Sequence, residues 1–475
     1  MSRADDGRSP APPAAAAGPL TTPLAGPPAD ARSAEPSGPR NRVLALSTTG
    51  FTLMFAVWLM FGVLGVPIRD EFGLTDVELS WLTATAILNG ALWRLPAGLL
   101  TDRFGGRRVF ILMLLATALP TFLVSQATTF TTLLVFAFFA GFAGNAFSVG
   151  IAWNSAWFPR ERQGFALGVF GAGNVGASVT KLVGPALIAA VPSLTVLGLT
   201  FDGWRFVPLM YTALLIAMAV AMWTLAPRHD RTPGKGRPLR EMLAPLRHVR
   251  VWRFSLYYVV VFGAYVALSA WLPKYYVDVF DVSLAVAALL TALFIFPASL
   301  LRPVGGWLAD RYGARIVMYW TFGAMLVACG ILMMPYGYIV LRVSPEVEPS
   351  GFREVLPYEL GIVPFTALVF LVGVSMGVGK AAVFKHIPEY FPHDVGAVGG
   401  LVGTLGALGG FFLPPMFAYL QAWTGMPQST FLLLFTLALV SAVWMHVTIG
   451  RMLRRRSPDL TGEIEEPDAE ELARS

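Results

Sequence analysis

The chain has 475 residues, of which 55% are hydrophobic and 13% are charged, and its formal net charge is +6. Soluble domains carry about 25% charged residues, so this composition excludes a soluble enzyme, a soluble nucleic-acid-binding protein and a secreted disulfide-rich domain. The lone cysteine, Cys329, lies in an apolar stretch and has no partner for an intramolecular disulfide. We therefore expect an all-α protein with many membrane-spanning helices.

The first 42 residues differ in composition from the rest of the chain. They lack the apolar core segment of a signal peptide, and 27 of them are Ala, Pro, Gly or Ser. Such a segment cannot bury a hydrophobic core, so we expect residues 1–42 to form a disordered cytoplasmic tail. The alternative, a transit peptide, is disfavoured by Asp5, Asp6 and Asp30.

Twelve apolar segments follow this tail, each long enough to cross a bilayer at roughly 20 residues per helix. They cover residues 43–66, 79–100, 108–126, 130–157, 165–190, 205–226, 252–273, 284–308, 315–337, 362–386, 395–422 and 429–450. A basic stretch divides them six and six, and we interpret it as a solvated linker rather than a DNA-binding arm. The expected domains are the tail 1–42, a six-helix bundle 43–227, a cytoplasmic linker 228–251, a second six-helix bundle 252–450 and a cytoplasmic tail 451–475.

The basic residues predict how the spans are oriented. If the N-terminus is cytoplasmic, 26 of the 35 Lys and Arg residues lie on that side, five lie on the other and four lie within spans. Lys and Arg concentrate in the cytoplasmic loops of membrane proteins. We therefore expect both termini in the cytoplasm of a multi-pass protein of the cell's inner (plasma) membrane, with no nucleic-acid partner.

The second and eighth spans end in related sequences. "WRLPAGLLTDRFGGRR" (93–108) and "LRPVGGWLADRYGARI" (301–316) align at a fixed offset of 208 residues. The alignment pairs Arg94 with Arg302, Asp102 with Asp310, and Arg103 with Arg311. Two related six-helix halves are typical of transporters that rock about a central site. We expect the aspartates and the arginines after them to act in conformational gating, with the aspartates capping the next helix or pairing with a nearby arginine in one access state.

Four cations lie inside apolar spans, where no Asp or Glu is found at mid-span. They are Arg94, Lys181, Arg302 and Lys380. An uncompensated buried charge is strongly unfavourable, and an anionic cargo is the simplest remedy, although a lysine near a helix end can also reach the membrane surface. Because a guanidinium presents a planar fork of donors, we expect the two repeat-related arginines to clamp a small planar oxyanion between the halves.

Neutral residues in the spans support a site for such an anion. Aromatic faces suit a flat, weakly hydrated ion, and the inward-facing candidates are Phe55, Phe61, Phe147, Tyr258 and Phe262. Asn174 provides a neutral donor in the middle of a span. Small residues recur every three or four positions in 168–185 and 396–415, which lets helices approach closely and slide.

These stretches carry a resemblance to a known family. "GLLTDRFGGRR" and "GWLADRYGAR" resemble the loop motif of the major facilitator superfamily. "FGAGNVGASVTKLVGPAL", "GVGKAAVFKHIPEYFP" and "GAVGGLVGTLGALGGFFLPP" resemble the signature segments of its nitrate/nitrite porters, the NarK-like family. The resemblance covers roughly residues 43–450.

The resemblance implies the major facilitator fold, with twelve transmembrane helices in two six-helix bundles, and a transporter of nitrate that is not an enzyme. It implies that Arg94 and Arg302 bind nitrate, and Asn174, Tyr258 and Phe262 match further positions of the family's signatures. It implies no cofactor and no metal, and transporters of this plan usually work as monomers in the lipid bilayer.

The coupling mechanism depends on Lys380, where many members of the family carry Asn. The Lys-bearing form resembles the branch regarded as proton-coupled nitrate importers, and the Asn form is linked with nitrate/nitrite exchange. Repulsion by two arginines and burial disfavour a charged Lys380, so this residue could release a proton. His386, Lys181 and Glu389 are further candidates for the proton site.

We therefore expect nitrate/proton symport for nitrate assimilation. The alternatives are a nitrate/nitrite antiporter, in which the cations only hold anions, and a membrane nitrate receptor, for which the repeated loop motif has no use. A membrane hydrolase is disfavoured, because "GVSMG" (373–377) lies within an apolar helix and not in a strand-turn-helix elbow. The five histidines show no metal-ligand spacing.

Overall fold

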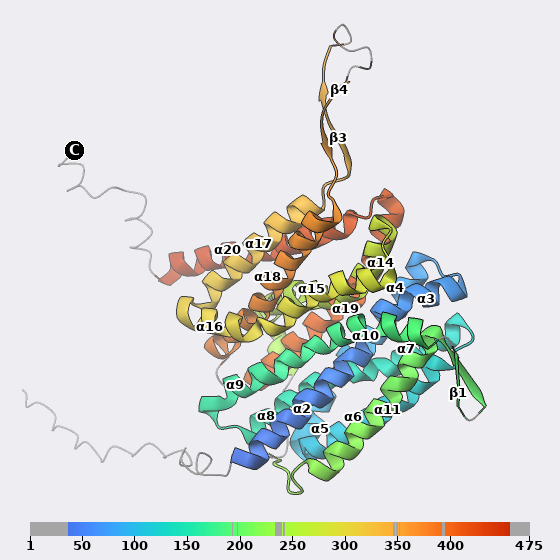
Figure 1. The fold of residues 1–475 in the computed structure, drawn as a ribbon. Coiled ribbons are helices and arrows are strands. Elements are labelled where there is room, and N and C mark those ends of the chain that lie inside the picture. The colour runs from blue at the N-terminus through green and yellow to red at the C-terminus, as the bar shows by residue number, and fades with distance from the viewer. Residues whose placement is uncertain are drawn as a thin grey trace, which may run out of the picture.

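A computed structural model describes residues 37–191, 193–196, 198–232, 240, 243–344, 347, 350, 352–391 and 395–456. Most of these residues are helical, and the helices of the first and second parts of the chain gather in two groups (Figure 1). The tail expected at 1–42 falls outside the described residues up to residue 36, and α2 (Ser37–Trp58) begins directly after it. The C-terminal tail from 457 onward and linker residues 233–239 also fall outside them.

More helices of the first half follow α2, and several consecutive helices form one span together. They are α3 (Phe61–Phe72), α4 (Asp76–Leu92), α5 (Arg94–Phe104), α6 (Gly106–Ser125), α7 (Phe130–Ala140), α8 (Ala146–Trp157), α9 (Arg160–Gly171), α10 (Gly176–Ala190) and α11 (Phe206–Leu225). The 3-10 turns η1 (Gly141–Asn145) and η2 (Ala172–Val175) interrupt two spans, and η3 (Gly203–Arg205) precedes α11. Strands β1 (Ser193–Val196) and β2 (Leu199–Asp202) form an antiparallel hairpin.

The second half repeats this plan after the short turn η4 (Ala244–Arg247). Its helices are α13 (Val249–Tyr258), α14 (Ala264–Phe280), α15 (Leu284–Leu300), α16 (Arg302–Tyr312), α17 (Ala314–Leu332), α18 (Ile362–Tyr390), α19 (Val395–Thr424) and α20 (Ser429–Arg456). A π-helical turn, η5 (Val259–Gly263), joins α13 to α14. Strands β3 (Gly337–Arg342) and β4 (Phe352–Tyr358) pair antiparallel, with an irregularity at Ile339/Val340, and project from the helices (Figure 1).

The expected fold class is confirmed. Ten helices in the described part of the chain are long and apolar enough to cross a membrane, or eleven when the bent pair α15–α16 counts as one span. Helices α4 and α5, with 17 and 11 residues, correspond to the second predicted segment and are separated only by Trp93. The seventh segment was expected to end at residue 273, whereas its helix continues to Phe280.

Close backbone contacts explain many of the glycines in the spans. A Cβ on Gly141 would lie 2.0 Å from the carbonyl oxygen of Ala86, and one on Gly176 would lie 1.9 Å from that of Thr52. No side chain fits at either position. Both glycines flank or begin an interruption of a helix, so the breaks occur where neighbouring backbones touch.

The two halves meet along α4–α19, α10–α15 and α3–α14. Both β-hairpins lie at one end of the molecule, which we call the hairpin end, and the loops after α5 and α16 lie at the other, the linker end (Figure 1). In the predicted orientation the linker end faces the cytoplasm. The candidate site lies between these ends, at the breaks of the spans.

Candidate functional site

The two repeat-related arginines occupy equivalent places at helix breaks. Arg94 is the first residue of α5, after Trp93, and Arg302 is the first residue of α16, after Leu301. The second break bends α15 against α16 by 43°. The N-terminus of a half-helix carries a positive partial charge, so each break adds to the field of its arginine and favours an anion nearby.

Arg94 is buried, with 2% of its surface exposed. Its Nε donates to the carbonyl oxygen of Gly90 at 3.0 Å, and its Nη1 donates to that of Gly403, on α19 of the other half, at 3.1 Å. Its Nη2 is buried and finds no acceptor within the described residues. One side of the guanidinium is therefore held, while the other side has a free donor.

Arg302 faces the same ring as Arg94. Their guanidinium carbons lie 5.4 Å and 5.6 Å from the ring centre of Phe147, so they are no more than about 11 Å apart. Nη1 of Arg302 is buried, and no described residue accepts a hydrogen bond from it. A Cβ on Gly171 would lie 3.3 Å from this nitrogen, so the glycine lets α9 approach the guanidinium. The structure thus brings the two repeat-related arginines to one aromatic ring.

Tyr258 and Phe262 line the same region from the second half. Their rings are stacked with centres 5.0 Å apart, and the Phe262 ring lies 5.3 Å from the guanidinium carbon of Arg94. The π-helical turn between them places both side chains on one face, and such turns are frequent at functional sites. The Tyr258 hydroxyl is buried, and the described residues offer it no hydrogen-bond partner.

Asn174 lies in the 3-10 turn η2 and is fully buried. Neither its side-chain nitrogen nor its side-chain oxygen has a partner among the residues that the structure describes. Its backbone oxygen accepts a hydrogen bond from the Tyr265 hydroxyl at 3.3 Å. An unpaired amide at such a depth is available to a ligand.

Lys380 lies near Arg94, because both contact the ring of Phe262. Its ammonium lies 5.6 Å from the ring centre of Phe262, which also contacts Arg94, and 3.2 Å from that of Tyr265. The ammonium donates to the carbonyl oxygen of Ala298 at 2.9 Å. We call Arg94, Arg302 and Lys380 the core cations.

Tyr265 is a site residue that the sequence analysis missed. Its hydroxyl bonds to Ser299 Oγ at 2.9 Å and to the Asn174 backbone of the other half, while its ring faces Lys380. The available signal was its position one helical turn after Phe262. Of the other aromatic candidates, Phe55 stacks on Tyr265 at 6.5 Å, whereas Phe61 lines a small cavity toward the hairpin end.

The other proton-site candidates lie apart from the core cations. Lys181 donates to the carbonyl oxygen of Leu59 at 3.2 Å, at the break between α2 and α3. His386 is buried near the linker end, where its Nδ1 lies 2.9 Å from the Ala382 carbonyl oxygen and its ring packs on Phe254. The side chain of Glu389 lies outside the described residues.

The loop motif shows different partners in its two copies. Asp310 forms an ion pair with Lys385, whereas Asp102 makes no hydrogen bond or ion pair in the part of the chain that is described. Arg103 lies on the ring of Phe104, and Arg311 lies on the rings of Trp307 and Tyr312.

The expected helix capping by these aspartates is not found. Gly105 and Gly313 precede α6 and α17, and neither helix has a side-chain cap. In the first half a linker residue supplies the carboxylate instead, because Asp230 accepts the backbone N–H of Arg107 at 2.7 Å.

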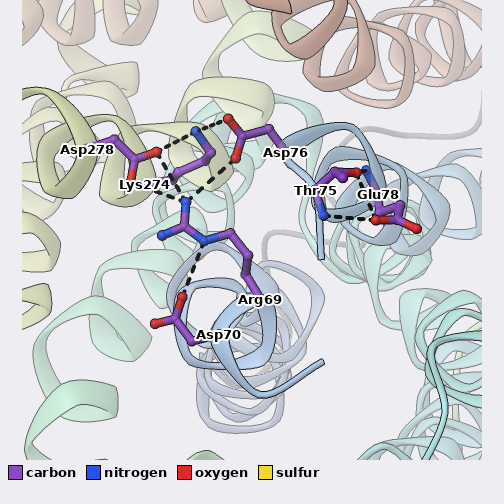
Figure 2. Close-up of polar contacts among 7 residues, drawn as sticks. All are labelled: Arg69, Asp70, Thr75, Asp76, Glu78, Lys274 and Asp278. Atoms are coloured by element: carbon purple, nitrogen blue, oxygen red, sulfur yellow. Dashed lines mark hydrogen bonds and ion pairs between the residues drawn. The ribbon is translucent and has the colours of Figure 1, made fainter. Parts of the chain in front are cut away.

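Carboxylates gather at the hairpin end and not around the core cations. Arg69 of α3 lies 3.2 Å from Asp278 of α14, and Lys274 of α14 lies 2.9 Å from Asp76 of α4 (Figure 2). Arg69 also pairs with Asp70, and Lys274 with Asp278. We call these five residues the hairpin-end cluster. The sequence analysis had placed Lys274 outside the spans, but it is 3% exposed and neutralised by two carboxylates.

Comparisons with known proteins agree with this arrangement. The model of the Major Facilitator Superfamily matches residues 46–344 and 280–472. The chain is 67% identical over 427 residues to a "Probable nitrate/nitrite antiporter NarK1" of Thermus thermophilus, covering 90% of this chain and 95% of that protein. It is 32% identical over 406 residues to the "Nitrite extrusion protein" of Bacillus subtilis, covering 85% and 94%.

Solved structures show the same fold. A bacterial homologue of the human lysosomal transporter Spinster, in an inward-facing and unoccupied conformation, superimposes with a TM-score of 0.63 at 16% identity. The match covers 87% of this chain and 97% of that one. At this identity the likeness concerns the fold alone.

Proposed function

This chain belongs to the nitrate/nitrite porter family of the major facilitator superfamily, and from this premise we propose that it carries nitrate across the membrane between Arg94 and Arg302. The family consists of transporters and not of enzymes. The chain is a multi-pass membrane protein, and the proposal places it in the plasma membrane, as a monomer with both termini in the cytoplasm.

A set of buried, unpaired donors carries the proposal. Arg94 Nη2, Arg302 Nη1, the Tyr258 hydroxyl and the Asn174 amide are all buried and lack partners within the described residues. A buried donor without an acceptor costs about 1–3 kcal/mol, and more when it is charged. A planar oxyanion offers acceptors in several directions at once and supplies the missing negative charge, whereas a neutral solute supplies no charge.

Alternating access follows from the placement of these donors on both halves. Arg94 and Asn174 belong to the first half, and Arg302 and Tyr258 belong to the second. An anion between them binds both halves at once, and rocking of one half against the other exposes the anion to each side in turn. A receptor would need no such division of its ligands.

We further propose that nitrate enters with a proton, and that Lys380 carries it. The guanidinium groups stay protonated at any working pH, so Lys380 is the core cation that can lose its charge. Three cations facing one monovalent anion leave two charges in excess, and loss of a proton from Lys380 reduces this excess. The contact of its ammonium with Tyr265 supports a link between this charge and both halves.

Exchange of nitrate for nitrite is the second candidate. It is favoured by the name of the Thermus thermophilus relative, a "Probable nitrate/nitrite antiporter". In this mechanism Lys380 keeps its charge and adds to the attraction for either anion, and each half-cycle requires a bound anion.

Reconstitution in liposomes distinguishes the two mechanisms. Nitrate uptake is measured with an imposed inward proton gradient and empty vesicles, and again with nitrite-loaded vesicles without a gradient. Uptake in the first condition alone supports symport, and uptake in the second alone supports exchange. Absence of nitrate uptake in both conditions contradicts the proposed function.

A further inference from the structure

A second group of cations, for which the described residues provide no carboxylate partner, lies at the linker end of the second half. We call this group, together with two tyrosines beside it, the linker-end cluster. Its members are Arg250, Arg253, Arg315, Tyr257 and Tyr390. These residues come from α13, the start of α17 and the end of α18. The proposed transport function uses none of them.

Contacts around Tyr390 bring the three arginines together. Nη2 of Arg315 donates to the Tyr390 hydroxyl at 2.8 Å, and the guanidinium carbon of Arg250 lies 5.2 Å from the Tyr390 ring centre. Arg253 lies on the ring of Phe254, whose centre is 5.6 Å from that of Tyr390. Like charges gathered in this way repel one another.

Burial makes this repulsion costly. Arg253 is 6% exposed, and no hydrogen bond or ion pair to it is found within the described residues. The Tyr257 hydroxyl next to it belongs to a side chain that is 1% exposed, and it too has no partner among the residues that the structure describes. The cluster thus offers a buried guanidinium and an unpartnered hydroxyl donor to the same ligand.

At the equivalent place in the first half, the start of α6, a carboxylate occupies the position. The offset of 208 residues places Arg107 on Arg315, at the starts of α6 and α17. In the first half the Asp230 carboxylate accepts the backbone N–H of Arg107 and the indole N–H groups of Trp153 and Trp157, at 2.7, 2.9 and 3.0 Å. In the second half, none of the described carboxylates occupies the corresponding position.

From this comparison we infer that the linker-end cluster is a second anion site, which binds an oxyanion such as nitrate or a phosphate group. Arg253 and Arg315 supply charged donors, Tyr257 supplies a neutral one, and Tyr390 holds Arg315 in place. The oxyanion takes the role that Asp230 fills in the first half. This site stands whether or not Arg94 and Arg302 bind nitrate.

Binding to the full-length protein in detergent tests the site. Nitrate and inorganic phosphate are titrated calorimetrically into the Arg302→Lys variant, in which the central site is weakened. We expect residual binding of at least one anion, weakened about tenfold or more by the additional change Arg253→Gln, since one charged hydrogen-bond donor is lost. Arg108→Gln is the matched control, because it removes an exposed cation at the same end without changing the cluster.

A second variant guards against a folding defect. Tyr257→Phe keeps the ring that packs on Phe322 at 5.4 Å and removes only the hydroxyl. We expect it to weaken the residual binding severalfold with an unchanged unfolding temperature. Absence of residual binding in Arg302→Lys, or residual binding that Arg253→Gln and Tyr257→Phe leave unchanged, overturns the proposal.

A further experiment in lipid nanodiscs distinguishes a lipid headgroup from a dissolved anion as the source of the oxyanion. The phosphate titration is repeated in nanodiscs of phosphatidylcholine with and without phosphatidylglycerol. Competition by phosphatidylglycerol that depends on Arg253 identifies a lipid headgroup as the occupant, whereas Arg253-dependent binding without competition identifies a dissolved anion. Either result supports the site, and binding independent of Arg253 in both membranes contradicts it.

Discussion

The core and the hairpin end differ in whether described carboxylates neutralise their buried cations. At the hairpin end, Arg69 and Lys274 lie between Asp76 and Asp278, and the ion pairs connect α3 and α4 to α14 (Figure 2). In the core, Arg94, Arg302 and Lys380 contact aromatic rings and backbone carbonyls, and no described carboxylate reaches them. A cation that is already neutralised holds two halves together, whereas a cation without a counter-ion attracts one from solution. In the proposed mechanism, the hairpin end is therefore the part of the molecule that closes, and the core is the part that binds.

The largest effect is expected from Arg302→Lys or Arg94→Lys. Each change keeps the charge but removes the planar fork, so that one charged hydrogen bond to the anion is lost. We expect nitrate uptake into proteoliposomes to fall about 10–100-fold. The exposed Arg342, changed to Lys, serves as the control and should leave uptake unchanged. Equal uptake by Arg302→Lys and the wild type would remove the central site from the proposal.

A change at the hairpin end should affect closure instead of binding. The double change Asp76→Asn and Asp278→Asn removes the ion pairs between the halves, while the capping box of Thr75 and Glu78 still holds the start of α4. We expect a cysteine at position 80 to be labelled about tenfold faster by a membrane-impermeant thiol reagent, in a chain that also carries Cys329→Ala. Ser80 is fully buried and lines the small cavity below the cluster.

The control for this experiment is Asp70→Asn, because Asp70 pairs with Arg69 only within α3. It should leave the labelling rate as it is. If the double variant is also labelled at the unchanged rate, the hairpin-end cluster does not hold the halves closed. If the double variant loses nitrate binding as completely as Arg302→Lys, the separation between closing and binding fails.

Lys380→Asn should change the pH dependence of uptake more than nitrate affinity. The change leaves both arginines in place and removes the core cation that can lose its proton. We expect nitrate affinity within about tenfold of the wild type, because both arginines keep their charged hydrogen bonds to the anion. Uptake should no longer depend on external pH. Lys181→Gln provides the comparison, since Lys181 bonds to Leu59 away from the core cations, and it should retain the pH dependence. Identical pH profiles for Lys380→Asn and the wild type would exclude Lys380 as the proton carrier.

The smallest effect on transport is expected from Asp230→Ala. This change leaves the indole N–H groups of Trp153 and Trp157 and the backbone N–H of Arg107 without their acceptor. A lost buried hydrogen bond costs about 1–3 kcal/mol, so we expect a lower unfolding temperature with nitrate affinity unchanged. An unchanged unfolding temperature would show that the linker contact does not stabilise the first half.

The sequence predicted the core better than the contacts that surround it. Arg94 and Arg302 could be paired in advance, because charges inside apolar segments are rare and the repeat relates them at a fixed offset. Tyr258, Phe262 and Asn174 came from local segments with recognisable signatures. The fold class followed from composition and from the number of apolar segments.

The missed residues depend on contacts between distant segments. Tyr265 acquires its role from Lys380 and from the Asn174 backbone, 115 and 91 positions away along the chain. Lys274 seemed to lie outside its span because α14 continues past the apolar segment, and Asp76 meets it only when the halves pack together. Asp230 replaces the motif aspartates at the start of α6 because the residues that follow α11 lie beside that helix start. No local pattern contains this information.

A structure determined with bound nitrate tests the central claim most directly. We predict planar ligand density between Arg94 and Arg302 on the face of Phe147, within hydrogen-bond distance of Arg94 Nη2 and Arg302 Nη1. Nitrate found elsewhere, with both of these nitrogen atoms still unpartnered, would contradict the claim that the core cations form the transport site.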